Sequence, residues 1–247
     1  MVEFRDTNEL RDAKFIDVDL SGARFIGARL NGAVLRGVDL MGVEIDSPWL
    51  FEKGNSLMVD GVDVVPFVDA ELDKRFPGRS LRRAGDPAGL REAWSAVERG
   101  WEALLARVAA MPDGTVDIRV AGEWSFAETL RHLIMATDVW LGRAIRESEE
   151  PYHPIGLPYT RSDLPPSDIE KPSYPEVLRV RAEHQAQVRD FIAEVSETDL
   201  AVERRNPWAP DRTETTVHCL QVILEEEWEH QRYAVRDLDA IDAGTID

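Results

Sequence analysis

The residues best suited to chemistry lie near the C-terminal end of the sequence, where Glu226 and His230 stand four positions apart. A helix has 3.6 residues per turn, so both side chains should point to the same side and, with their apolar neighbours in line, toward the core. Those neighbours are Cys219, Leu220, Ile223, Ala234, Leu238 and Ile241. Burying a carboxylate beside an imidazole is costly unless something satisfies both, and an (i, i+4) pair can converge on one ion. The spacing therefore predicts a metal site.

Four long stretches of helical periodicity supply the elements that would carry such a site. They cover residues 87–111, 125–148, 174–195 and 214–241. The second opens with Ser125 and Glu128, which can cap each other's free backbone donors. Prolines recur between residues 151 and 172, so this connection is not helical and is long enough to let the second and third helices run parallel. We expect a mainly α protein built on a four-helix bundle.

A period of five residues runs through the N-terminal part of the chain. Each quintet has a bulky apolar residue and, two positions earlier, a small or β-branched one. The bulky residues are Phe15, Leu20, Phe25, Leu30, Leu35, Leu40 and Ile45. This period fits neither a helix nor a strand, and over residues 13–46 the pattern resembles the pentapeptide-repeat family. The resemblance implies a right-handed, square β-solenoid of fewer than two coils, which should need a neighbour to pack on.

The solenoid is expected to be a short appendage. Some longer pentapeptide proteins mimic DNA and bind topoisomerases, but a structural role or a homodimer contact fits this length better. Asp60-Gly61 is a strong hairpin-turn dipeptide between two apolar runs, and Pro77-Gly78 and Gly85-Asp86-Pro87 are typical of a linker. The expected division is a pentapeptide stub with a β-hairpin over 1–66, a linker over 67–86 and the bundle over 87–247.

Composition limits the partners and the compartment. Forty-seven acidic against twenty-nine basic side chains give a formal net charge of −18, which argues against a nucleic-acid backbone or an anionic membrane as partner. No apolar run approaches the roughly 18 residues of a membrane span. Cys219 is the single cysteine, and the charged start at 1–5 lacks the apolar core of a signal peptide. We expect a cytoplasmic protein in which Cys219 serves packing.

The bundle residues also resemble a known superfamily. Gly122-Glu123-Trp124-Ser125, leading into Leu130-Arg131-His132-Leu133 and followed much later by Glu226 and His230, resembles the DinB-like metal-binding four-helix bundles over roughly residues 85–242. The resemblance implies one divalent metal held by His132, Glu226 and His230. Glutamate as the second ligand is similar to the branch that includes mycothiol-dependent maleylpyruvate isomerase.

His132 depends on that resemblance, because its own helix leaves its role open. The main apolar stripe of the helix passes through Phe126, Leu130, Leu133, Ile134, Thr137 and Leu141. His132 points away from this stripe, although it shares its side with Met135, Ala136 and Val139. From the pattern alone it could equally be a surface residue.

The remaining conspicuous residues are assigned more ordinary roles. His153, His184 and His218 have no partner at ligand spacing, so we expect solvation or local hydrogen bonding. Trp208 lies in the proline-flanked loop before the last helix, where it would either anchor the loop or line a substrate pocket.

A set of His, Glu and His leaves one coordination position open, as in catalytic zinc sites. Zinc is the expected metal, with nickel and iron as alternatives. The resemblance implies that a low-molecular-weight thiol such as mycothiol binds there as a nucleophilic thiolate. The function expected is a metal- and thiol-dependent S-transferase or isomerase acting on a small electrophile.

Two other classes of function stay open at this point. One is a non-catalytic, metal-stabilised bundle that acts as an association or stress-response module. The other is non-haem iron oxygenase chemistry, which also uses two histidines and a carboxylate, but those enzymes are usually β-barrels and the helical pattern argues against it.

Overall fold

The computed structural model describes residues 2–52, 54–158 and 171–246. Its internal contacts divide the chain into two compact units, Met1–Asp46 and Ser47–Asp247. The sequence predicted a first boundary at residue 66. The structure instead groups the hairpin after the repeats with the helical unit.

The first unit is a coil of turns that repeats every five residues. A residue in the left-handed region stands at each corner, two positions after a bulky one. These residues are Asp12, Asp17, Gly22, Gly27, Gly32, Gly37 and Gly42, with φ between 53° and 75°. Glycine adopts this conformation without strain, which explains why it fills most corners. No strand is assigned between residues 2 and 46, and the bulky side chains stay exposed, as with Phe25 at 61%.

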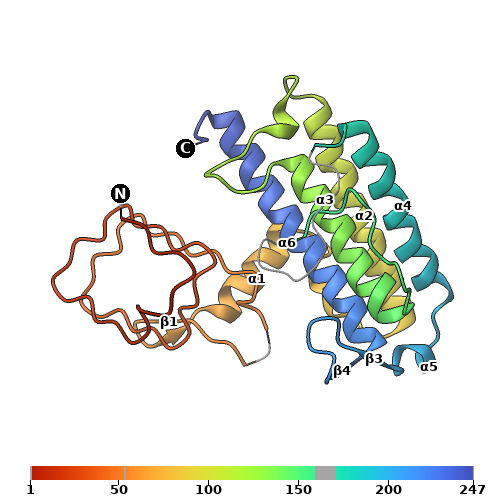
Figure 1. Ribbon diagram of the computed structural model, residues 1–247, viewed down its shortest axis with the longest axis horizontal. Coiled ribbons are helices and arrows are strands. Elements are labelled where there is room, and N and C mark those ends of the chain that lie inside the picture. Colours follow the sequence, from red (N-terminus) through yellow and green to blue (C-terminus); the bar gives the residue numbers. More distant parts are fainter. Residues whose placement is uncertain (1, 53, 159–170, 247) are drawn as a thin grey trace. The chain divides into compact units, whose positions relative to one another are not determined.

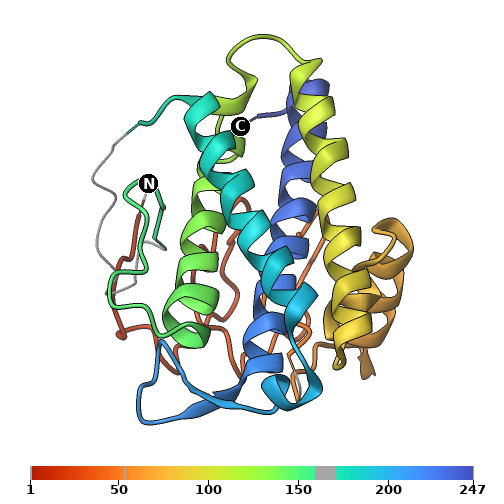
Figure 2. The same cartoon turned by 90° about the vertical axis from the view of Figure 1, so that its right-hand side faces the viewer.

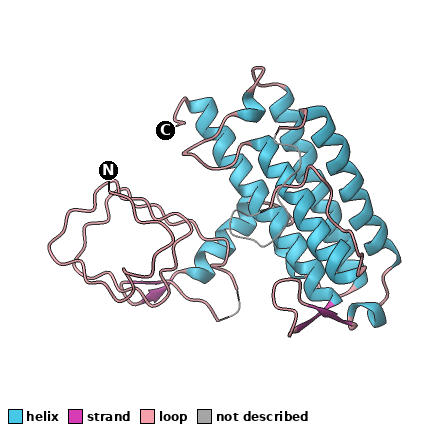
Figure 3. Cartoon of the chain, viewed as in Figure 1, coloured by secondary structure: helices cyan, strands magenta, loops and turns pink. Residues whose placement is uncertain are grey.

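The predicted hairpin is present. Strands β1 (Met58–Val59) and β2 (Val62–Asp63) pair antiparallel (Figure 3). Asp60 and Gly61 have φ of 48° and 83°, so both central residues have the positive φ that a tight two-residue hairpin loop requires.

The predicted linker over 67–86 is wrong. Helix α1 (Val65–Arg75) and the 3₁₀-helix η1 (Arg79–Arg83) occupy it. Pro66 lies in the first turn of α1 and does not break the helix, because a backbone N–H at this position would have no partner within the helix. Gly78 has φ 98°, and a Cβ there would lie 2.6 Å from that of Ala96, so this glycine allows close packing rather than flexibility.

Two buried arginines hold α1 and η1 together. The side chains of Arg79 and Arg82 are each 1% exposed. Arg79 reaches Asp69 at 2.8 Å and Asp73 at 2.7 Å, and Arg82 reaches Asp69 at 2.6 Å. Charges this deep are tolerated only when they are paired. The ion pairs therefore make this segment part of the packed unit.

The four predicted helices form the bundle (Figures 1 and 2). They are α2 (Pro87–Ala109), α3 (Phe126–Thr137) continued by the π-helix η3 (Asp138–Ile145), α4 (Tyr174–Glu194) and α6 (Thr216–Ala243). Helices α2 and α3 each pack against both α4 and α6. The core includes Trp94, Trp101, Trp140 and Trp228, which are all buried. Helices α3 and α4 run parallel, as the sequence predicted, although part of their connection lies in 159–170, outside the described residues.

Short elements complete the connections. The 3₁₀-helix η2 (Thr115–Asp117) precedes α3, while α5 (Glu197–Leu200) and the hairpin β3 (Glu203–Arg205) with β4 (Thr213–Thr215) lie between α4 and α6. Thr215 caps α6 by accepting from the His218 amide at 3.3 Å. None of the helices in the described part of the chain combines the length and apolar character that crossing a membrane requires.

Replacing Asp69 by Asn should destabilise the helical unit in a pH-dependent way. Burial alone would raise the pKa of this carboxyl, but hydrogen bonds from Arg79 and Arg83 and the charge of Arg82 hold it at about 2. An unfolded Asp has a pKa of about 3.9, so the shift corresponds to about 2 kcal/mol of stability at neutral pH.

Because the pKa is lower in the folded state, this stability is present above about pH 4 and is lost as the pH falls toward 2. Urea unfolding of wild type and Asp69→Asn at several pH values measures it. The gap between the two should narrow on acidification. A gap that does not depend on pH would contradict the assignment.

Candidate metal centre

The three predicted ligands come from two helices of the bundle. His132 lies on α3, whose start is fixed by the predicted capping box: Ser125 accepts from the Glu128 amide at 3.4 Å, and Glu128 accepts from the Ser125 amide at 2.9 Å. Glu226 and His230 lie one turn apart on α6. Because α3 packs directly against α6, the three side chains can meet between them.

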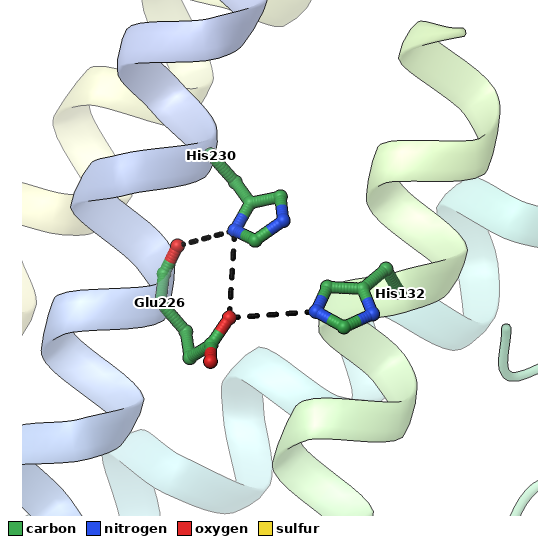
Figure 4. A group of neighbouring side chains, drawn as sticks. All are labelled: His132, Glu226 and His230. Carbon is green, nitrogen blue, oxygen red and sulfur yellow. Dashed lines mark hydrogen bonds and ion pairs between the residues drawn. The ribbon is translucent and has the colours of Figure 1, made fainter. Parts of the chain in front are cut away.

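The side chains do converge (Figure 4). His132 Nε2 lies 3.4 Å from Glu226 Oε2, and His230 Nδ1 lies 3.6 Å from the same oxygen. One ligand atom from each residue can be chosen so that all lie within 4.8 Å of one another. The centres of the two imidazole rings are 4.7 Å apart. This spacing suits three donors around one ion.

Backbone carbonyls place a proton on Nδ1 of both histidines. His230 Nδ1 donates to the carbonyl of Glu226 at 2.8 Å, and His132 Nδ1 donates to the carbonyl of Leu157 at 3.3 Å. A carbonyl oxygen only accepts, so the facing nitrogen must carry the proton. Each ring therefore turns Nε2, the nitrogen usual in metal-bound histidines, away from its carbonyl partner; Nε2 of His132 faces Glu226 Oε2 at 3.4 Å.

The electrostatics agree with ligands ready to bind a cation. Burial lowers the pKa of His230 to about 4, and the charge of His132 acts in the same direction, so the His230 imidazole is neutral at neutral pH. Burial raises the pKa of Glu226, but the hydrogen bond and charge of His132 and the charge of His230 outweigh it and hold the pKa below its usual range. An ionised carboxylate and a free imidazole lone pair result.

The face of α6 differs from the sequence projection. Glu226 is 34% exposed at its side chain and lies at the edge of the core rather than in it. The deeply buried carboxylate is its neighbour Glu227, which pairs with Arg181 of α4 at 2.5 Å and accepts from Trp101 of α2 at 2.6 Å. The three consecutive glutamates 225–227 do not reveal from sequence which one is buried, because that depends on the position of Arg181 in the fold.

Comparison with protein families agrees with this geometry. Residues 96–234, more than half of the chain, match the model of the DinB superfamily, and residues 9–44 match pentapeptide repeats in eight copies. The chain belongs to the DinB superfamily. Comparisons with curated proteins and with solved structures find no match. The repeats thus begin earlier than the residues 13–46 expected from the sequence.

The DinB bundle places one aromatic side chain at the site that the sequence did not single out. The ring of Trp124 lies 4.6 Å from that of His132 and 6.3 Å from that of His230, between centres. Trp124 directly precedes Ser125, the N-cap of α3, so the start of this helix also positions the Trp124 ring. The sequence signal for its role was its place in the motif directly before the cap.

Trp208, predicted as a substrate contact, is elsewhere. It lies between β3 and β4, is 51% exposed, and makes no described contact with His132, Glu226 or His230. A role in substrate binding stays a prediction. Its amide donates to Asn206 Oδ1 at 2.8 Å, which orders the loop.

Of the other singled-out residues, His218 makes a local contact as expected, but His184 differs from the expectation because its partner Asp138 lies 46 residues away in the sequence. His184 is buried and bonded to Asp138 and to the carbonyl of Val180, both at 2.8 Å, while His218 pairs with Glu214 at 3.7 Å. Burial raises the pKa of the Cys219 thiol to about 11, so no thiolate forms at neutral pH.

The donor set fits a divalent metal of the DinB type. Two imidazoles and a carboxylate suit zinc, nickel or iron, and three protein donors leave a position for a further ligand. Among the described residues, this is the one group of three or more His, Cys, Asp and Glu side chains with such spacing.

Replacing Glu226 or His230 by Ala should strip most divalent metal from the purified protein, because each change removes one of three donors. Metal affinity should fall by more than the roughly 10- to 100-fold that is typical when a residue behind a ligand is lost, and the metal content should fall accordingly. His218→Ala is the matched control, since it removes a histidine of the same helix that lies outside the group. Elemental analysis showing full occupancy in both ligand variants would refute the assignment.

Proposed function

We propose that the protein binds one divalent metal, most readily zinc, through His132, Glu226 and His230, and that it acts as a thiol-dependent S-transferase or isomerase on a small electrophile. The observation that carries the proposal is the convergence of the three donors within 4.8 Å, with Nδ1 of both histidines held by a backbone carbonyl so that Nε2 is the nitrogen left for an ion. Membership of the DinB superfamily supports a metal-binding role.

A divalent metal there would lower the pKa of a low-molecular-weight thiol such as mycothiol and so supply a thiolate at neutral pH. The chain's own residues orient the reactants. Trp124 and Tyr233 flank the histidines, with the Tyr233 ring centre 5.8 Å from that of His230, and would form the apolar side of the site. Buried Cys219 is excluded as the nucleophile by its raised pKa, so the thiol must come from outside the chain.

The partners proposed are therefore a small thiol and a small electrophile rather than a nucleic acid or a membrane. The net charge of −18 supports this choice, because it would repel polyanions. A cytoplasmic location, where such thiols are reduced, is part of the proposal. The pentapeptide unit is proposed as an appendage or a homodimer contact.

Metal binding should stabilise the folded protein. Zinc at about 100 times its dissociation constant should raise the free energy of unfolding by about 2.7 kcal/mol, because it binds the folded state alone. Thermal melts with zinc and with a chelator measure the effect, and Glu226→Ala should abolish it. A melting temperature that is indifferent to chelator in the wild type would contradict a tightly bound ion.

Thiol binding separates a catalyst from a metal-stabilised module. In the cobalt-substituted protein, adding mycothiol or a similar thiol should produce a sulfur-to-cobalt charge-transfer band and release protons near neutral pH, because the free thiol has a pKa of about 8.5. Both responses should be absent in His132→Ala and retained in His218→Ala. A cobalt spectrum that responds to no cellular thiol would leave the non-catalytic bundle as the better account.

A further inference from the structure

A second cluster of charged groups lies on α3 beyond the metal ligands, where the helix widens into its π turn. Asp138 is the first residue of η3 and is buried. Its Oδ1 faces His184 Nε2 at 2.8 Å, and its Oδ2 accepts from the backbone amide of His153 at 2.8 Å. Single π turns inside α-helices occur often at functional sites. Asp138 thus joins η3, α4 and the loop after η3.

The same loop returns to the metal ligands. Arg131 Nε donates to the carbonyl of Ile155 at 2.9 Å, and the Leu157 amide donates to the carbonyl of Arg131 at 3.1 Å. The next contact is the one from His132 Nδ1 to the carbonyl of Leu157. Residues 153–157 are therefore attached at one end to Asp138 and at the other to His132.

We infer that Asp138 is a positioning residue for His132. By holding the amide of His153, its carboxylate sets the path of residues 153–157 and so keeps the Leu157 carbonyl where it accepts from His132 Nδ1 and orients the ring. His184 holds Asp138 in turn. Its Nδ1 donates to the carbonyl of Val180, and its Nε2 contacts Oδ1 of the Asp138 carboxylate. The inference rests on the proposed metal function only for its effect on affinity.

Two observations distinguish this role from simple core packing. One carboxylate oxygen of Asp138 accepts from a backbone amide of the loop, so the path of the loop depends on Asp138, and not only its contact with His184 of α4. The cluster is also not sealed in the core: Asp138, His153 and His184 line a pocket of about 340 Å³ together with Arg146 and Tyr152. If position 138 served packing alone, a hydrophobic residue there would avoid the cost of desolvating a carboxylate.

The variants that test this differ only at residue 138. Asp138→Asn keeps an oxygen for the His153 amide and can donate its own amide to a neutral His184 ring. Asp138→Ala removes both contacts, and Asp138→Ser, whose hydroxyl lies too near the backbone to make both, replaces it if the alanine variant does not fold. Ile192→Ala is the matched control, because it opens a cavity in the same core about two turns beyond His184 on α4.

The first measurement uses metal-free protein with ¹⁵N-labelled histidine, in which two-bond ¹H–¹⁵N spectra report the tautomer of each ring. His132 should carry a proton on Nδ1 in wild type, Asp138→Asn and Ile192→Ala, and should lose that proton in part of the molecules in Asp138→Ala or Asp138→Ser, where Nε2 alone donates to Glu226. The second is zinc affinity by chelator competition, where the alanine or serine variant should bind about 10-fold or more weakly and the asparagine variant within about threefold of wild type.

Full retention of the His132 Nδ1 proton in the alanine and serine variants would overturn the inference. So would an equal loss of zinc affinity in Ile192→Ala, since that would trace the effect to general destabilisation. If wild type binds no zinc, the proposed function fails, while the tautomer comparison still decides the role of Asp138.

Discussion

The buried ion pair between Glu227 and Arg181, with Trp101 donating to the same carboxylate, sets the rotation of α6 within the bundle. Burial raises the pKa of Glu227 against the opposing effect of Arg181, so the carboxylate can remain charged inside only in contact with that partner. Three helices contribute one residue each. Since one residue corresponds to 100° of rotation, fixing Glu227 toward Arg181 also directs Glu226 toward α3 and His132. The three proposed metal ligands thus depend on a contact that none of them makes.

A second constraint acts on the other side of the site. α6 supplies the carbonyl that orients His230 from within its own helix, because residues i and i+4 are neighbours there. For His132 on α3 the orienting carbonyl comes from outside the helix, because its Nδ1 contacts Leu157 in the loop after η3. Part of the site is therefore local in sequence, and part depends on a segment whose path must be fixed by its own contacts. That difference explains why Arg131 of α3 and Asp138 of η3 both bind residues 153–157.

The parts of the structure that follow from local rules could be predicted from the sequence. Helix periodicity, the Ser125–Glu128 cap and the Asp60-Gly61 turn each depend on neighbouring residues, and all are present. The linker prediction failed because prolines and glycines do not by themselves end a packed segment, and because the ion pairs of Arg79 and Arg82 with Asp69 cannot be recognised without the fold. The same limit applies to α6: its apolar stripe could not show that Glu227 rather than Glu226 is buried, since Arg181 lies 46 residues away in the sequence. His132 needed the superfamily motif, because its partner is on another helix.

The charge of the donor set bears on which ligand the open position would favour. Histidines bind metals as neutral imidazoles, so Glu226 supplies the one negative charge of the group. The adjacent Glu227 is compensated by Arg181 and adds no net charge nearby. With a divalent ion the site would keep one net positive charge in partly desolvated surroundings, where His132 and His230 are only 13% and 12% exposed. An anionic fourth ligand is then favoured over a neutral one, because charge interactions strengthen as water is excluded. A second carboxylate among the donors would have removed that preference, so the His, Glu, His composition favours an anionic ligand, a class that includes the proposed thiolate.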